Sequence, residues 1–318
     1  MENRVLGKSG IVVSRFGMGV LPIGKSHMNL DLDAGQAIIR YALERGITFF
    51  DTAEYYETYP YIRAALKDSK TEPILCSKSL ARDYNSMARS IDEMRAYFDR
   101  DVLDIFLLHE VREFPDFEDR SGAWRCLCDA KAKGIVRAIG LSTHHVDVAR
   151  LNADLPESDV LFTLINKDGL GIRDGKNAGT REAMEEAIRQ NSDVGKGVYA
   201  MKVFGGGNLV KDYSEALDYV SHLPGIDAIM VGLGSIPEAD ALVAYANGQL
   251  SPEYKVNLSN KKIRIVECDC EGCGSCMPRC PNKAISIGQN KCAQINYDVC
   301  ITCGYCAPIC PVRAIVLF

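Results

Sequence analysis

The sequence lacks the features typical of membrane, secreted and nucleic-acid-binding proteins. No apolar run within its 318 residues approaches the length of a membrane span. The opening stretch MENRVLGKSGIVVS has no apolar segment of the kind that a signal peptide carries. Acidic and basic residues are mixed throughout, with a formal net charge of −5, so no basic stripe indicates nucleic acid. We therefore expect a cytoplasmic protein that binds neither membrane nor nucleic acid.

Cysteine is scarce in most of the chain and abundant at its end. Of 13 cysteines, only Cys76, Cys126 and Cys128 precede residue 260, and the other ten lie in the last 51 residues. Disulfide scaffolds belong mainly to secreted chains, and no export signal is present here. The uneven distribution therefore indicates a metal-binding segment in a reducing compartment.

The C-terminal cysteines form a duplicated run with an offset of 30 residues. Each run reads C-x2-C-x2-C-x3-C-P, and Ala284 recurs as Ala314. This spacing is typical of a pair of 4Fe–4S clusters, in which the fourth cysteine of each run ligates the other cluster. The predicted ligands are Cys270, Cys273, Cys276 and Cys310 for one cluster, and Cys300, Cys303, Cys306 and Cys280 for the other.

Zinc is the alternative metal for this segment, because soft thiolates suit it as well. Zinc sites, however, usually combine paired C-x2-C knuckles, often with histidine. Cys268 and Cys292 have no counterpart in the duplication, and we interpret them as spare thiols. From residue 262 onward the chain resembles a bacterial-type two-cluster ferredoxin.

Residues 13–250 alternate between short apolar runs and amphipathic stretches of helical length. Strands joined by helices favour a parallel sheet, and eight such units in about 240 residues favour a (β/α)8 TIM barrel. A doubly wound open sheet is the alternative, although no G-x-G-x-x-G follows the first strand. The predicted strands are VSRFGMGV, ITFFDTA, PILCSKS, LDIFLLHE, VRAIGLST, VLFTLIN, GVYAMKV and IDAIMVG; helices are expected at 33–45, 84–100, 119–133, 145–153, 180–191 and 236–246.

The two patterns divide the chain into three parts. We expect a (β/α)8 barrel over residues 1–250, a linker over 251–261 and a small α+β ferredoxin-like domain over 262–318. Residues 1–12 are expected to form a hairpin that closes the bottom of the barrel.

Ionisable residues end three consecutive predicted strands. Asp51 ends the second run, Lys78 the third and His109 the fourth, while Tyr56 follows Asp51 by five residues. Active sites of such barrels form where the strands end, so these side chains are expected to meet at one mouth.

The stretches FFDTAEYYE, ILCSK and DIFLLH resemble the aldo/keto reductase family, whose catalytic tetrad is Asp, Tyr, Lys and His. The resemblance spans roughly residues 4–246 and selects Tyr56 over Tyr55. It implies a carbonyl-reducing enzyme in which Tyr56 donates a proton and Lys78 lowers the tyrosine pKa. Asp51 would then anchor Lys78, and His109 would orient the substrate.

The resemblance also implies NAD(P)H bound across the mouth. Three glycines after the seventh strand offer backbone N–H groups suitable for a pyrophosphate. The stretch GLGSIPEADALV carries no cation to hold a 2′-phosphate, so the choice between NAD and NADP stays open. The predicted contacts are Ser142, Asn166, Gly205, Gly206, Gly207 and Ser235.

Joining a barrel to an iron–sulfur segment leaves three hypotheses. The first is a carbonyl reductase whose clusters relay single electrons. The second is a ferredoxin-type electron-transfer protein or flavin-coupled oxidoreductase on a reductase-like barrel, since a flavin accepts one electron or two. The third is a structural role for the clusters. A small carbonyl compound and a redox partner protein are the expected partners.

Overall fold

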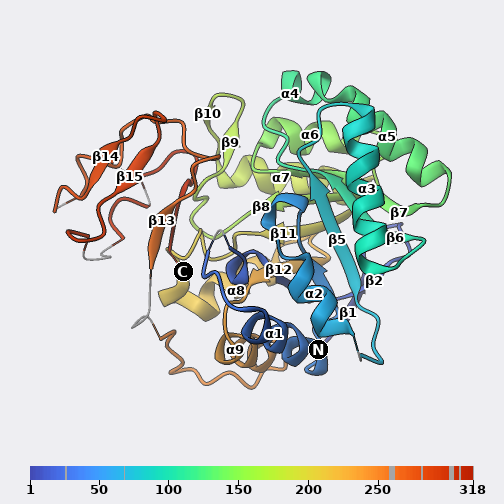
Figure 1. Cartoon of the computed structure of the whole chain (residues 1–318), viewed down its shortest axis with the longest axis horizontal. Helices are drawn as coiled ribbons and strands as arrows, with labels where there is room; N and C mark the ends of the chain where they lie inside the picture. Colours follow the sequence, from blue (N-terminus) through green and yellow to red (C-terminus); the bar gives the residue numbers. More distant parts are fainter. Residues whose placement is uncertain are drawn as a thin grey trace.

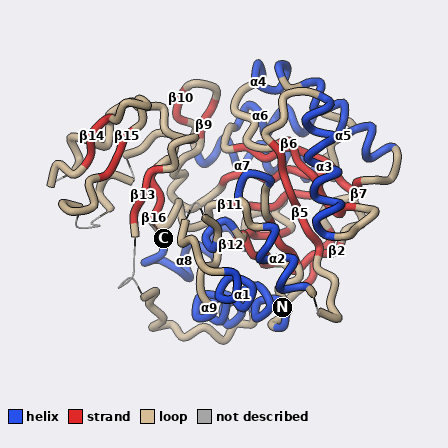
Figure 2. The backbone as a smooth tube through the Cα atoms, viewed as in Figure 1, coloured by secondary structure: helices blue, strands red, loops and turns tan. Residues whose placement is uncertain are grey.

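Eight parallel strands close into a barrel that helices surround (Figures 1 and 2). The computed structural model describes residues 1–25, 27–67, 69–257, 262–280, 282–300, 304–307 and 309–317. The barrel strands are β3 (Phe16–Gly19), β4 (Phe49–Asp51), β5 (Ile74–Ser79), β6 (Leu103–Leu108), β7 (Val136–Thr143), β8 (Val160–Leu164), β11 (Gly197–Met201) and β12 (Ala228–Gly232). Every predicted run contains one of these strands, and the TIM-barrel prediction is confirmed.

A helix follows each barrel strand and packs its apolar side against the sheet. The six helices expected from the sequence are present, and α2, α4 and α8 complete the ring. Both α2 and α4 carry a proline in the first turn. The helices are α1 (Leu32–Glu44), α2 (Tyr59–Leu66), α3 (Tyr84–Phe98), α4 (Phe114–Asp119), α5 (Ser121–Ala132), α6 (Val146–Asp154), α7 (Arg181–Asp193), α8 (Tyr213–His222) and α9 (Ile236–Ala246), with 3-10 turns η1 (Leu21–Ile23), η2 (Glu54–Tyr56) and η3 (Val210–Asp212).

The alternation of side chains along the strands aims the predicted catalytic residues into the barrel. Phe49, Cys76 and Leu107 belong to the apolar cluster inside the barrel. Successive side chains of a strand point to opposite faces, so residues two positions further along share the inner face. Those positions are Asp51, Lys78 and His109.

A hairpin closes the other end of the barrel, as expected. It pairs β1 (Asn3–Val5) with β2 (Val12–Ser14) in antiparallel register. Leu6, Ile11 and Val13 are fully buried there and join the inner cluster. A short excursion between β8 and α7 forms a second hairpin from β9 (Arg173–Asp174) and β10 (Asn177–Ala178).

The C-terminal segment folds as two interleaved two-stranded ladders. Strand β13 (Ile263–Ile265) pairs with β16 (Ile315–Leu317), and β14 (Ile285–Ile287) pairs with β15 (Ala293–Ile295). The duplication of 30 residues maps β13 onto β15 and β14 onto β16, so each ladder combines one strand from each repeat. This crossing brings the end of the second run beside the beginning of the first.

Residues 251–257 of the predicted linker contain no helix or strand, and residues 258–261 lie outside the described part. Within the described residues, no helix combines the length and the apolar character needed to span a membrane.

Candidate functional site

A buried ion pair links the ends of β4 and β5. The Lys78 ammonium donates to Asp51 Oδ1 at 2.7 Å and also to the Thr52 carbonyl oxygen. Lys78 is 1% exposed and Asp51 is 4% exposed. Burial raises the pKa of Asp51, while the charge of Lys78 opposes that shift. The ion pair and the bond to Thr52 therefore hold the Lys78 ammonium in a fixed position at the mouth of the barrel.

Tyr56 and His109 lie beside this ion pair. Tyr56 Oη and His109 Nε2 are 3.4 Å apart, and the Lys78 ammonium lies 5.1 Å from the centre of the Tyr56 ring. Burial, and then the charges of Lys78 and Arg120, lower the pKa of His109 well below its usual value. His109 is therefore a neutral imidazole at neutral pH. The structure brings all four predicted catalytic residues together.

The pKa of Tyr56 differs from the sequence-based expectation. Burial raises it well above the ordinary value, and the neighbouring Tyr55 and Asp51 raise it further. Lys78 faces the ring of Tyr56. Desolvation thus dominates over any lowering by the lysine, and Tyr56 holds its proton at neutral pH.

Arg120 supports the site and was not identified from the sequence. Its guanidinium donates to the carbonyl oxygens of His109 at 2.8 Å, Ser79 at 3.1 Å and Ala81 at 3.1 Å. It lies at the start of α5 and is 2% exposed. The arginine therefore ties the ends of β5 and β6 together. No local pattern around it indicates these long-range contacts.

Two predicted nicotinamide contacts, Ser142 and Asn166, have protein partners. Ser142 Oγ accepts the backbone N–H of Glu110 at 2.8 Å, which leaves its own proton available. Asn166 Nδ2 donates to the carbonyl oxygens of Leu170 at 3.0 Å and Lys202 at 3.4 Å, and Asn166 Oδ1 accepts from Leu170 N. The Asn166 amide thus joins the loops after β8 and β11.

The predicted contact Ser235 caps helix α9. Its hydroxyl accepts the N–H of Glu238 at 3.4 Å, and the Glu238 carboxylate accepts the N–H of Gly234 at 2.7 Å. The Glu238 carboxylate also accepts the backbone N–H of Ser235, so the two residues form a capping box. A carboxylate already occupies the positive end of the helix, which disfavours a phosphate at the same place.

The glycines after β11 contact the C-terminal strand. Gly205, Gly206 and Gly207 all have positive φ, at 53°, 67° and 88°. Leu317 N donates to Gly206 O at 3.1 Å, and a Cβ at Gly207 would lie 2.4 Å from Leu317 O. Strand β16 therefore packs where the sequence suggested a pyrophosphate cradle. The pyrophosphate assignment stays a prediction.

Replacing Gly207 by alanine is expected to weaken this packing. The change adds about 1–2 kcal/mol of backbone strain at positive φ and a further 1–3 kcal/mol of overlap with Leu317. Gly248→Ala is the matched control, because Gly248 has a φ of 67° and no atom within 4 Å of an added Cβ. Thermal unfolding and hydrogen exchange of β16 measure the effect. Equal losses in the two variants would show that the contact contributes nothing.

An ionic cluster joins the loop that carries His109 to the first cysteine run. Arg112 Nη2 donates to Glu110 Oε1 at 2.9 Å and to the Cys268 carbonyl oxygen at 3.2 Å, and lies 3.8 Å from Asp269. The Tyr55 ring stacks on His109 at 5.4 Å. A Cβ at Gly171 would lie 2.3 Å from Arg313 Cγ. The C-terminal segment from residue 262 onward, called the tail below, therefore packs directly against the barrel mouth.

Glu110 should make stability depend on pH. Burial, and then the charge of Asp269, raise its pKa to about 7, against the opposing charge of Arg112. The folded protein then holds an extra proton between roughly pH 4.5 and 7, so stability falls as pH rises through that window. Glu110→Gln should remove up to about 3 kcal/mol of this dependence. Thermal midpoints of the iron-loaded protein between pH 5 and 7 test it, with the exposed Glu118→Gln as control. A Glu110→Gln curve parallel to wild type would contradict the assignment.

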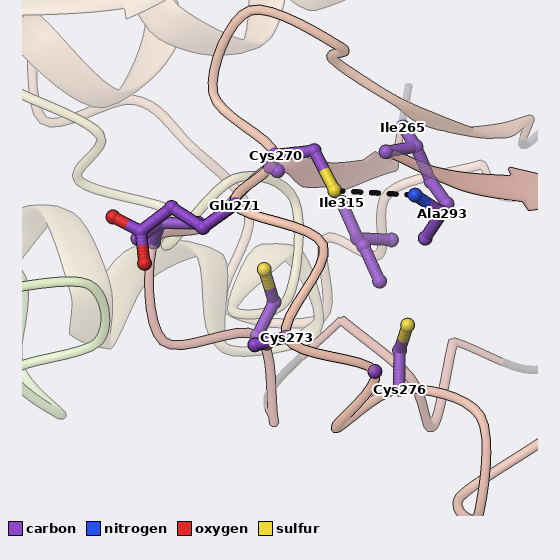
Figure 3. A pocket seen from close by; sticks show the side chains of 11 residues that line it. Ile265, Cys270, Glu271, Cys273, Cys276, Ala293 and Ile315 are labelled. Atoms are coloured by element: carbon purple, nitrogen blue, oxygen red, sulfur yellow. Dashed lines mark hydrogen bonds between the residues drawn. The ribbon is translucent and has the colours of Figure 1, made fainter. Parts of the chain in front are cut away.

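Four predicted ligands line one pocket in the tail (Figure 3). Its walls include Ile265 of β13, Ala293 of β15 and Ile315 of β16. Figure 3 shows the three labelled sulfur atoms pointing toward a common space. The Ala293 backbone N–H donates to Cys270 Sγ at 3.3 Å. The cysteines that line this pocket are Cys270, Cys273, Cys276 and Cys310, drawn from both runs.

The remaining predicted ligands lie in the same tail. Cys280, Cys300 and Cys306 border its apolar core, and Cys280 Sγ accepts the N–H of Ala284 at 3.2 Å. Cys303 and Pro281 lie outside the described residues. Over the described part of the tail and barrel, no three His, Cys, Asp or Glu side chains are arranged to hold a metal ion. In a cubane each thiolate binds its own iron, so the ligands stand around a cavity.

The two unmatched thiols lie next to the first run. Cys292 Sγ is 3.5 Å from the Glu267 carbonyl oxygen and 3.7 Å from that of Cys270. Burial, with the charge of Asp269, raises the pKa of Cys268 to about 11. Neither thiol lines the pocket.

Sequence comparison gives the class of protein. Residues 15–222 match the aldo/keto reductase family, and residues 293–316 match the 4Fe–4S binding domain. The chain therefore belongs to the aldo/keto reductase family and is an oxidoreductase with a 4Fe–4S binding domain.

Individual relatives are distant. The chain is 33% identical over 125 residues to 2,5-diketo-D-gluconic acid reductase B of a Corynebacterium species, covering 37% of this chain and 44% of that protein. It is 26% identical over 187 residues to L-galactose dehydrogenase of Arabidopsis thaliana, covering 55% and 58%. The chain thus spans about half the length of the curated relatives it matches.

Solved structures share the fold. An aldo-keto reductase of Bacillus halodurans in its holo form superposes with a TM-score of 0.64 at 17% identity, covering 81% of this chain and 93% of that one. A Pseudomonas aeruginosa protein assigned to the aldo-keto reductases gives 0.65 at 21%, covering 78% and 95%.

Proposed function

We propose that this chain reduces the carbonyl group of a small molecule with NAD(P)H, and that two 4Fe–4S clusters in its tail relay single electrons. The observation that carries the proposal is the buried group of four ionisable side chains at the barrel mouth. Asp51 holds Lys78 at 2.7 Å, and Tyr56 lies 3.4 Å from His109. These residue types in this arrangement suit proton donation to a developing alkoxide.

Each side chain has a separate task in this proposal. A bound nicotinamide supplies two electrons as a hydride. Tyr56, protonated at neutral pH, gives its proton to the carbonyl oxygen as negative charge develops there. The Lys78 ammonium beside the ring stabilises the resulting phenolate. Neutral His109 donates a hydrogen bond to the same oxygen and orients it.

Two observations on the described tail residues support iron–sulfur binding. Cysteines from both runs surround one apolar pocket, and backbone N–H groups donate to Cys270 and Cys280 sulfur. Hydrogen bonds to sulfur are a known means of tuning such clusters. A 4Fe–4S cluster supplies or accepts one electron at a time. We propose residues 262–318 as this domain, 1–250 as the reductase barrel and 251–261 as the linker. A redox partner protein would exchange electrons with the tail.

A second function is favoured by one observation. Strand β16 packs on the Gly205–Gly207 loop, and Glu238 caps α9, so the predicted pyrophosphate contacts have protein partners. This arrangement supports a flavin-coupled or ferredoxin-type electron-transfer protein on a reductase-like barrel. In such a protein the Gly205–Gly207 loop does not have to bind the pyrophosphate of a nicotinamide dinucleotide.

Anaerobic purification of the iron-loaded protein separates the two functions. NADH and NADPH oxidation is measured with a panel of aldehydes, ketones and oxo acids, and the visible spectrum is searched for flavin beside the iron–sulfur absorbance. Carbonyl-dependent oxidation of either nicotinamide is the expected result. Bound flavin without such oxidation would replace the first function by the second.

A further inference from the structure

One side of the β13–β16 ladder faces the barrel mouth. Ile263 belongs to the tail core and Ile265 lines the cysteine pocket, so Arg264 between them projects from the opposite face. Its cross-strand partner is Val316. A Cβ at Gly206 would lie 4.0 Å from Val316 Cγ1, which places this face against the loop after β11.

Arg264 is partly buried and incompletely paired. Its Nε is buried and has no hydrogen-bond partner among the residues that the structure describes. A buried donor without a partner costs free energy unless a ligand satisfies it. The charges of both Arg264 and Lys202 depress the pKa of His27, after the larger effect of burial. Both cations therefore lie within electrostatic reach of the same histidine.

Lys202 stands on the barrel side of the same region. It directly follows β11 and adopts a left-handed conformation with φ of 56°. Such strain in a non-glycine residue is often retained at functional sites. Its charge also lowers the pKa of His109, after burial and the charges of Lys78 and Arg120. Lys202 therefore lies within electrostatic reach of the candidate catalytic residues.

The acidic groups of the region are already engaged. Arg112 pairs with Glu110 at 2.9 Å and approaches Asp269 at 3.8 Å. The pKa of Glu110 is near 7, so its carboxyl is only partly charged at neutral pH. Asp269 also acts on Arg264, and Lys202 acts on His109. Three cations, Arg112, Arg264 and Lys202, therefore share one charged and one partly charged carboxylate.

We propose that Arg264 and Lys202 form an anion-binding site that holds the carboxylate of an oxo-acid substrate while its carbonyl oxygen faces Tyr56 and His109. The proposal rests on the carbonyl-reducing function above and names its substrate class. The planar guanidinium of Arg264 suits bidentate binding of a carboxylate. The iron–sulfur segment then contributes a specificity residue to the mouth, and the barrel alone holds only half of the site.

The test is a binding measurement that does not depend on turnover. Anaerobic, iron-loaded protein is titrated calorimetrically, without reductant, with benzoylformate and with its methyl ester, which has the same ketone and no charge. Arg264→Gln and Lys202→Gln are each expected to weaken benzoylformate binding by about 10- to 100-fold and to leave ester binding unchanged. Arg279→Gln, at an exposed arginine of the same tail, should bind as wild type does.

Further arms decide between the remaining outcomes. Iron content verifies that each variant is loaded, and Arg264→Lys, which keeps the charge but loses the bidentate geometry, should recover only part of the affinity. Unchanged benzoylformate binding in both glutamine variants overturns the proposal. Weakened NAD(P)H binding with benzoylformate unaffected also overturns it, because the cations would then serve the cofactor. If benzoylformate binds as expected but is never reduced, the anion-binding site is supported and the proposed carbonyl-reducing function is wrong.

Discussion

Tyr56→Phe is expected to lower the rate of carbonyl reduction by about 100- to 10,000-fold, the usual contribution of a positioned proton donor. The ring of Tyr56 still packs on Tyr55 and under Lys78, so substrate affinity and folding should change little. The measurement is kcat and KM with the best substrate under anaerobic conditions. Electron transfer from dithionite-reduced clusters to an artificial dye should stay at the wild-type rate.

Tyr55→Phe provides the matched control for this prediction. Tyr55 precedes the proposed donor and stacks on His109 through its ring, which phenylalanine retains. We expect its rate to stay within a fewfold of wild type. A large loss in Tyr55→Phe together with normal turnover in Tyr56→Phe would show that Tyr55, and not Tyr56, donates the proton.

Cys310→Ser is expected to remove the cluster held mainly by the first run, although Cys310 belongs to the second. Cys310 lines the same pocket as Cys270, Cys273 and Cys276. Iron content should fall from about eight atoms per chain to about four. Cys292→Ser is the control, since Cys292 does not line the pocket, and it should keep the full iron content.

Double variants sharpen this prediction about cross-ligation. Cys270→Ser combined with Cys310→Ser should lose no more iron than either change alone, because both cysteines would serve one cluster. Cys280→Ser combined with Cys310→Ser should lose nearly all of it. Loss of nearly all iron in the Cys270–Cys310 double variant as well would mean that each run holds its own cluster.

The barrel and the grouping of Asp51, Lys78 and His109 were predictable because they depend on local periodicity. Each residue lies two positions beyond an inward-facing apolar residue of its strand. Strand alternation alone then aims it into the barrel. The cysteine spacing is equally local, since one tight loop supplies three ligands of a cluster.

The remaining features depend on residues far apart in the chain. A run of three glycines has the same sequence whether it cradles a phosphate or admits a neighbouring strand, and only the position of Leu317 distinguishes the two. The contacts of Arg112 with residues 268 and 269 likewise join parts of the chain that are far apart in the sequence. The raised pKa of Tyr56 follows from burial, which no local pattern of residues reveals.

The central claim is that the carbonyl-binding mouth and the clusters exchange electrons within one chain. Anaerobic, iron-loaded protein is photoreduced until the cluster absorbance is bleached, and a carbonyl substrate is then added with NAD(P)⁺. We predict that the absorbance returns, with one alcohol formed for every two electrons and two protons consumed. Clusters that stay bleached, in protein that still reduces the same substrate with NAD(P)H, would contradict the claim.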